Sequence, residues 1–200
     1  MVINEKKLKE IASDYDHHMQ FKVDHWKFSK YREDELKVNP RDIIKEMEKI
    51  EEERVGTKPL PLQVFETNNI IVTAGMNESI DRDIGVSSTS LDYNSLGTSA
   101  TAESASQTDL VAEDSGGSYA RKQFSVDGSR ARVNQTAKYG MLWTDNDVSA
   151  TPLAIKESGV HWHATDASKM HARVVITTFT LDPGDLFVVQ INELHENGTL

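Results

Sequence analysis

Two histidines separated by one residue form the most chemically suggestive cluster in the chain, His161-Trp162-His163. Side chains on a β-strand alternate between its two faces, so both imidazoles would point to one side and could chelate a metal ion. His161 and His163 are therefore the candidate metal ligands. Two imidazoles are fewer than the three or four ligands that most metal sites use, and a surface turn in which Trp162 covers the domain edge is the alternative.

The same histidines allow an interpretation that involves catalysis. His161 and His163, followed by Gly184-Asp185 and later by His195, resemble the metal motifs of cupin barrels, in which histidines and a glutamate bind iron, manganese or zinc. The resemblance implies a metal-dependent enzyme that uses His161, His163 and His195. No glutamate follows His163 at the family's spacing, so a carboxylate ligand would have to come from elsewhere in the chain.

Glu157 and Arg173 form a second pair of interest, because each flanks an expected turn or strand start. A bidentate bond between carboxylate and guanidinium could fix a sheet edge, and two unrelated surface charges are the alternative. No expected strand aligns a nucleophile, a base and an orienting acid, and the phosphate-binding pattern GxxxxGK does not occur. The sequence therefore predicts no catalytic residues and a protein that is not an enzyme.

Composition narrows the function classes further. The chain has 200 residues, with Lys+Arg 22 against Asp+Glu 32, a formal net charge of -10 and 38% hydrophobic residues. This acidic balance argues against nucleic acid or an anionic membrane as a partner, since both require clustered Lys and Arg. The absence of cysteine excludes disulfides, thiolate metal sites and cysteine nucleophiles. No apolar run reaches the length of a membrane span, and the first residues lack a signal-peptide core, which predicts a soluble protein.

The elements that must position these residues fall into two halves of different composition. The first half is rich in Lys and Glu with few glycines, whereas the second is rich in Ser, Thr, Gly and Val. We expect a helical arm for docking or oligomerisation over residues 1–56 and an extended linker over residues 57–68. A β-rich domain is expected over residues 69–200.

Helical spacing of apolar residues supports the arm. A first stripe contains Leu8, Ile11 and Tyr15, and Asn39-Pro40 supplies a cap and a first-turn proline for a second helix that ends at Gly56. Neither helix can bury much surface alone, so we expect the arm to pack on the β domain or on another chain. The predicted interface consists of Leu8, Ile11, Tyr15, Trp26, Ile43, Met47 and Ile50.

Turn chemistry divides the second half into short strands. Strands are expected near residues 69–73, 91–96, 119–126, 131–143, 172–181 and 185–194. The Ser- and Thr-rich residues 86–108 are expected to form a long surface loop. No helical pattern intervenes, which favours an α+β protein whose N-terminal helical arm precedes a mainly antiparallel β-sandwich or barrel-like domain.

Five short motifs follow one another along this second half. They are Leu-Gly-Thr-Ser-Ala-Thr at 96–101, Asp-Leu-Val-Ala-Glu at 109–113, Ile-Lys-Glu-Ser-Gly-Val at 155–160, Met-His-Ala-Arg at 170–173 and Pro-Gly-Asp-Leu-Phe-Val-Val at 183–189. This order resembles a family of small β-domain proteins of tailed viruses, which includes tail, tail-fibre and other minor virion proteins. The resemblance covers roughly residues 70–198 and leaves the arm unexplained.

The resemblance implies a structural component of a viral particle, located in the virion, that acts through subunit assembly and surface contacts. Its expected partners are copies of itself in a cyclic homo-oligomer and other virion proteins. Trimeric viral fibres bind metal on a threefold axis, so an ion held there by His161 and His163 is the one cofactor that the resemblance allows. A host-surface or glycan-binding adhesin module that uses residues 86–108 is a further alternative.

Overall fold

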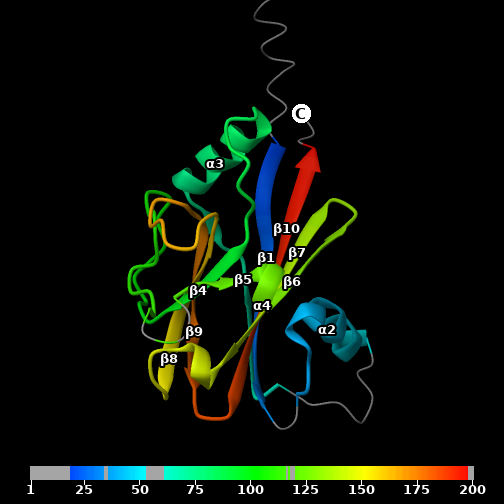
Figure 1. The fold of residues 1–200 in the computed structure, drawn as a ribbon, viewed down its shortest axis with the longest axis vertical. Coiled ribbons are helices and arrows are strands. Elements are labelled where there is room, and N and C mark those ends of the chain that lie inside the picture. Colours follow the sequence, from blue (N-terminus) through cyan, green and yellow to red (C-terminus); the bar gives the residue numbers. More distant parts are fainter. Residues whose placement is uncertain (1–18, 34–35, 53–60, 116, 118–119, 198–200) are drawn as a thin grey trace, which may run out of the picture.

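The computed structural model describes residues 19–33, 36–52, 61–115, 117 and 120–197, and these form two five-stranded antiparallel sheets (Figure 1). Sheet A has the strand order β2 (Gln63–Thr67), β1 (Met19–Arg32), β10 (Asp185–Asn197), β7 (Thr136–Thr144) and β6 (Gly128–Val133). Sheet B has the order β3 (Ile70–Ile71), β9 (Met170–Leu181), β8 (Leu153–His161), β4 (Tyr93–Gly97) and β5 (Lys122–Gln123). The helices are η1 (Pro40–Asp42), α2 (Ile43–Glu52), α3 (Thr73–Asp83), α4 (Phe124–Asp127) and η2 (Asp145–Asp147).

One hydrophobic core joins the two sheets. Phe28 on β1 stacks on Phe187 of β10 with ring centroids 5.7 Å apart, and Phe179 of β9 in sheet B meets Phe187 edge to face at 5.2 Å. A polar link crosses the same core, because Trp143 Nε1 on β7 donates to Asn94 Oδ1 on β4 at 2.8 Å. These contacts confirm the expected β-rich α+β class with antiparallel strands.

β9 and β10 follow each other directly in sequence yet belong to different sheets. The turn between them contains Gly184 at φ +77, a backbone conformation that residues with a Cβ rarely adopt. Asp185 opens β10 with a buried carboxylate, which lies 2.6 Å from Lys30 Nζ and 3.3 Å from Arg32 Nη1. The chain therefore changes sheets at a corner fixed by β1.

Residues 19–32 form a long strand, so the prediction of a separate helical arm over residues 1–56 is wrong for this part of the chain. β1 pairs along its length with β10 and also with β2, which lies inside the predicted linker over residues 57–68. Trp26 and Phe28 alternate with Lys27 and are fully buried in the shared core. This alternation of buried and less buried residues is typical of a strand. Because Trp26 is buried in the core of its own chain, it cannot contact a neighbouring subunit. Leu8, Ile11 and Tyr15 lie outside the described residues.

The second predicted helix is confirmed, with a different role. The Asn39 side chain accepts a hydrogen bond from Arg41 N, and α2 follows η1. α2 packs on sheet A, where Ile43 and Met47 are buried beside Val188. A Cβ at Gly140 on β7 would lie 2.2 Å from Ile43 Cγ2, so this glycine allows the close approach. Ile43 and Met47 therefore pack within their own chain. The Ile50 side chain and Gly56 lie outside the described residues.

Three further expectations need correction. The motif at residues 155–160, where a turn was expected beside Glu157, lies within strand β8. Residues 131–143, expected as one strand, belong to β6 and β7, which are joined at Asn134 with φ 55. The second half also contains α3, although no helix was expected there. The predicted last two strands are confirmed as β9 and β10. In the part of the chain that the structure describes, no helix combines the length and apolarity of a membrane span.

Candidate functional site

The predicted pair of Glu157 and Arg173 is confirmed as a buried ion pair. Arg173 Nε donates to Glu157 Oε2 at 2.7 Å, and both side chains are 0% exposed. Glu157 lies on β8 and Arg173 on β9, the two strands next to each other inside sheet B. The pair therefore lies in the middle of the sheet. The sequence had predicted it at a sheet edge.

This ion pair holds residues 98–113, which follow β4 and are called the loop below, against sheet B. The predicted loop over residues 86–108 overlaps this segment, but its middle part forms strand β4. Glu157 accepts hydrogen bonds from the backbone N–H groups of Ser99, Val111 and Ala112 at 3.3, 3.2 and 2.8 Å. Arg173 donates to the carbonyl of Thr101 and to the side chain of Gln107. One buried carboxylate and one buried guanidinium thus fix the loop at both ends and near its middle.

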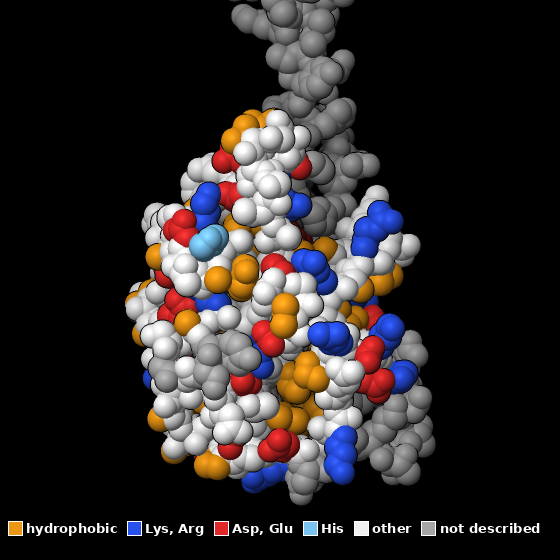
Figure 2. All heavy atoms as spheres, viewed as in Figure 1, with side chains coloured by type: hydrophobic (Ala, Val, Ile, Leu, Met, Phe, Trp, Pro, Cys, Tyr) orange, Lys and Arg blue, Asp and Glu red, His pale blue; other side chains and the backbone are white. Residues whose placement is uncertain are grey.

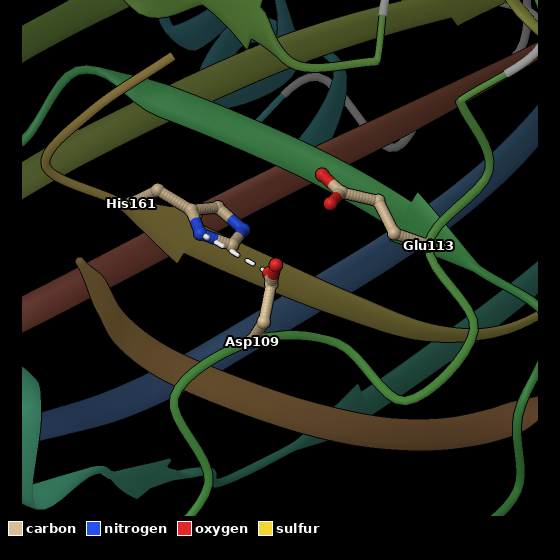
Figure 3. Close-up of side chains that lie close together, drawn as sticks. All are labelled: Asp109, Glu113 and His161. Carbon is tan, nitrogen blue, oxygen red and sulfur yellow. Dashed lines mark ion pairs between the residues drawn. The ribbon is translucent and has the colours of Figure 1, made fainter. Parts of the chain in front are cut away.

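A second polar cluster lies at the end of β8, under the same loop. His161 is fully buried, and its Nε2 is 2.6 Å from Ser95 Oγ on β4. Its Nδ1 lies 3.8 Å from Asp109 Oδ1, too far for a hydrogen bond, and has no hydrogen-bond partner among the described residues. Figure 3 shows the ring of His161 facing the carboxylates of Asp109 and Glu113, both of which come from the loop.

Arg121 binds both carboxylates and balances one of their two negative charges. Its Nε donates to Glu113 Oε1 at 2.7 Å, and its Nη2 donates to Asp109 Oδ1 at 2.8 Å. Its Nη1 donates to the carbonyls of His163 and Asp166, so the guanidinium also fixes the turn after β8. The Arg121 side chain is 3% exposed.

The surroundings of this cluster change the acidity of two groups. Burial, helped by the positive charge of Arg121, holds the pKa of His161 well below its usual range, so the imidazole is neutral. Burial raises the pKa of Asp109, and the negative charge of Glu113 raises it further, while Arg121 acts in the opposite direction. The cluster therefore combines a neutral imidazole with two carboxylates and one guanidinium.

The structure does not assemble the predicted metal pair of His161 and His163. β8 ends at His161, so the alternation of side chains on a strand does not extend to His163. His163 lies exposed in the following turn, where its Nδ1 accepts hydrogen bonds from the backbone of Thr165 and Asp166. His195, the third histidine of the cupin-type interpretation, lies on β10 in the other sheet, and its side chain is outside the described residues.

The carboxylate of Asp109 lies 3.8 Å from His161 Nδ1, too far to orient the ring by a hydrogen bond, so no nucleophile, base and orienting acid are aligned here. Ser95, His161 and Asp109 nevertheless lie close together. These are the residue types of a Ser-His-Asp hydrolase site. However, Ser95 and His161 are both 0% exposed. A Cβ at Gly159 would lie 2.9 Å from Leu110 Cδ2 and 3.1 Å from Ser95 Oγ, so the loop side chain Leu110 packs close above this part of the sheet. Substrate has no path to the hydroxyl in this arrangement. Ser95 and His161 are close together because of the register in which β4 pairs with β8, and this register is not evident from the sequence.

A fluorophosphonate probe, which reacts with activated serine hydroxyls, is expected to label the wild-type protein no faster than the Ser95→Ala variant. The reason is the complete burial of Ser95 and His161. Intact-mass spectrometry over a labelling time course measures both proteins. One label per chain that disappears in Ser95→Ala would show that the loop opens and that the trio is reactive.

Helix α3 presents an apolar row to solvent. Gly75 lets the helix approach sheet B closely, because a Cβ there would lie 2.3 Å from the carbonyl oxygen of His171 on β9. On the face away from the sheet, Met76, Ile80 and Ile84 recur every four residues and are 43%, 53% and 68% exposed. Figure 2 shows hydrophobic side chains at the top end of the molecule, where Figure 1 places α3. We call Met76, Ile80 and Ile84 the α3 row.

Comparison of the chain with protein-family models, with curated proteins and with solved structures gives no match. Function therefore has to be inferred from the residues and contacts described above.

Proposed function

We propose that this protein is a structural component of a viral particle, in the tail, a fibre, the baseplate or the capsid surface. It acts by assembling with copies of itself and with other virion proteins. The order of five motifs between residues 96 and 189, which resembles that of tailed-virus proteins, supports this role. We also infer that the two sheets form a sandwich, because each has its own edge strands and one shared core lies against both.

The α3 row is the observation that carries the proposal. Glycine at position 75 seats this helix firmly on β9, so its outer face is a fixed surface. Burial of one large aliphatic side chain contributes about 1.5–3 kcal/mol, and contiguous exposed apolar surface on a soluble protein marks an interaction site. The α3 row replaces Trp26, Ile43 and Met47 in the interface that we propose, since those side chains are buried in their own chain.

We propose a second copy of this chain as the partner of the α3 row. Asp81 and Asp83 flank the row, whereas Arg82 lies on the opposite side of the helix, with its guanidinium 4.9 Å from the centre of the Trp162 ring. Two copies that meet through the row must therefore keep these carboxylates at the solvent-exposed rim of the interface. Closed rings of identical subunits are the usual outcome of such self-association, and they match the symmetry of virion parts.

The Ile80→Asp variant tests self-assembly. We expect it to raise the dissociation constant of the oligomer at least 30-fold, which corresponds to loss of about 2 kcal/mol of apolar burial. Val126→Asp is the matched control, because it places the same charge at an aliphatic residue of similar exposure, 51%, on another helix, α4. Native mass spectrometry and light scattering measure the oligomers, and circular dichroism checks the fold.

Two results would contradict the proposed assembly. One is a wild-type protein that remains monomeric at millimolar concentration. The other is an oligomer that Ile80→Asp and Val126→Asp weaken equally. The cupin-type and glycan-binding alternatives have no comparable support. His163 is turned into its own loop, and within residues 86–108 Ser99, Thr101 and Gln107 are bonded to Glu157 and Arg173.

A further inference from the structure

The cluster beside Ser95 has the ligand atoms of a metal site, and this goes beyond the proposed structural function. Asp109, Glu113 and His161 each offer one ligand atom, and these atoms lie within 4.8 Å of one another. Ligand atoms around tetrahedral Zn²⁺ are about 3.4 Å apart, so shifts of about 1 Å would close the site. The Nδ1 atom of His161 is buried, faces this space (Figure 3) and has no hydrogen-bond partner in the described part of the chain.

His161 is also held as a metal-binding histidine usually is. Such residues bind the ion with one ring nitrogen and hydrogen-bond a protein group with the other, which fixes the ring. Nε2 of His161 lies 2.6 Å from Ser95 Oγ, which leaves Nδ1 as the free ligand atom.

Arg121 explains why the cluster is stable without an ion. Its guanidinium lies 2.7 Å from Glu113 and 2.8 Å from Asp109, and supplies one positive charge to two carboxylates. A dication that joined this arrangement would meet the guanidinium at close range and leave the cluster with an excess positive charge. Without Arg121, the two carboxylates would balance a dication.

We propose that Asp109, Glu113 and Nδ1 of His161 form a divalent-cation site of the zinc class, and that the guanidinium of Arg121 keeps it closed. Imidazole nitrogen and carboxylate oxygens suit Zn²⁺ or Co²⁺, and three protein ligands leave a fourth position for water. Binding requires that Arg121 leave the carboxylates. The site uses one chain, so it differs from a metal on a symmetry axis.

The Arg121→Ala variant tests this site with Zn²⁺ as the probe. At a Zn²⁺ concentration about 100 times the dissociation constant, we expect its Tm to rise by about 5–10 °C, with one Zn²⁺ per chain by native mass spectrometry. The wild-type Tm should change by less than about 1 °C at the same concentration. Adding His161→Gln to Arg121→Ala should abolish the Zn²⁺ effect, whereas adding His163→Ala should preserve it, because His163 is exposed and bonded to its own turn.

The proposal is wrong if folded Arg121→Ala shows no Zn²⁺-dependent rise in Tm, or if the rise persists after His161→Gln. It is also wrong if the wild type responds as strongly as the variant, because Arg121 would then not close the site. If Arg121→Ala does not fold in buffer, Arg121→Gln is the second variant, and refolding yield with and without Zn²⁺ becomes the measurement. Zn²⁺-dependent recovery supports the site, and equal yields contradict it.

Discussion

Replacing Arg173 with methionine is expected to lower the free energy of unfolding by about 3–5 kcal/mol, because it leaves the Glu157 carboxylate buried without its counter-charge. Both side chains are 0% exposed, so water cannot replace the lost guanidinium. The loss also removes donors to Thr101 and Gln107 of the loop over residues 98–113. Chemical denaturation followed by tryptophan fluorescence measures the change.

Arg132→Met is the matched control for this prediction. Arg132 lies exposed on β6, and the same substitution there is expected to change stability by no more than about 0.5 kcal/mol. A second comparison uses the variant that combines Glu157→Gln with Arg173→Met. It should be less destabilised than the sum of the two single variants, because no charge is left unpaired. If Arg173→Met falls within about 1 kcal/mol of Arg132→Met, the ion pair is not what holds the loop on sheet B.

The sequence was informative where local pattern and turn chemistry agree. The alternation in residues 185–194 after Asp182-Pro183-Gly184 predicted β10, and Asn39-Pro40 predicted the start of the helical segment that contains α2. Glu157 and Arg173 were found from their positions next to expected turns. Each of these signals lies within a few residues of the element that it predicts.

β1 was missed because its evidence is distant in sequence. Trp26 and Phe28 are two residues apart, as on one face of a strand. The polar residues next to them in the sequence gave no indication that both side chains are completely buried. The partner that buries them is β10, at the other end of the chain. The β-propensity of a few neighbouring residues cannot identify a partner so far away in the sequence. The structure of β1 is decided by its pairing with β10 on one side and β2 on the other.

The polar clusters were hidden for a related reason. The proximity of Ser95 to His161 depends on the register of β4 against β8, which pairs Ser95 with Gly159. Asp109 reaches the same place through a loop, and no sequence rule fixes its path. The α3 row is visible as apolar residues every four positions, yet spacing alone does not say whether such a row faces the core or solvent.

Deletion of residues 1–56 is expected to abolish folding, although the sequence alone predicted a helical arm there and a β-rich domain over residues 69–200. The deletion removes β1, which lies between β2 and β10 in sheet A, and also removes α2 from the outer face of that sheet. Loss of Trp26 and Phe28 alone would cost about 3–5 kcal/mol each, and together this approaches the whole stability of a typical domain.

Deletion of residues 1–18 is the matched control, because it removes an N-terminal segment and no residue of β1. We expect this shorter protein to give the near-ultraviolet circular dichroism and cooperative thermal transition of the wild type. The protein without residues 1–56 should show neither, since β10 then loses the partner that covers one of its two edges. A cooperative transition in that protein would mean that β2 can pair with β10 in place of β1, and that residues 1–56 are an arm after all.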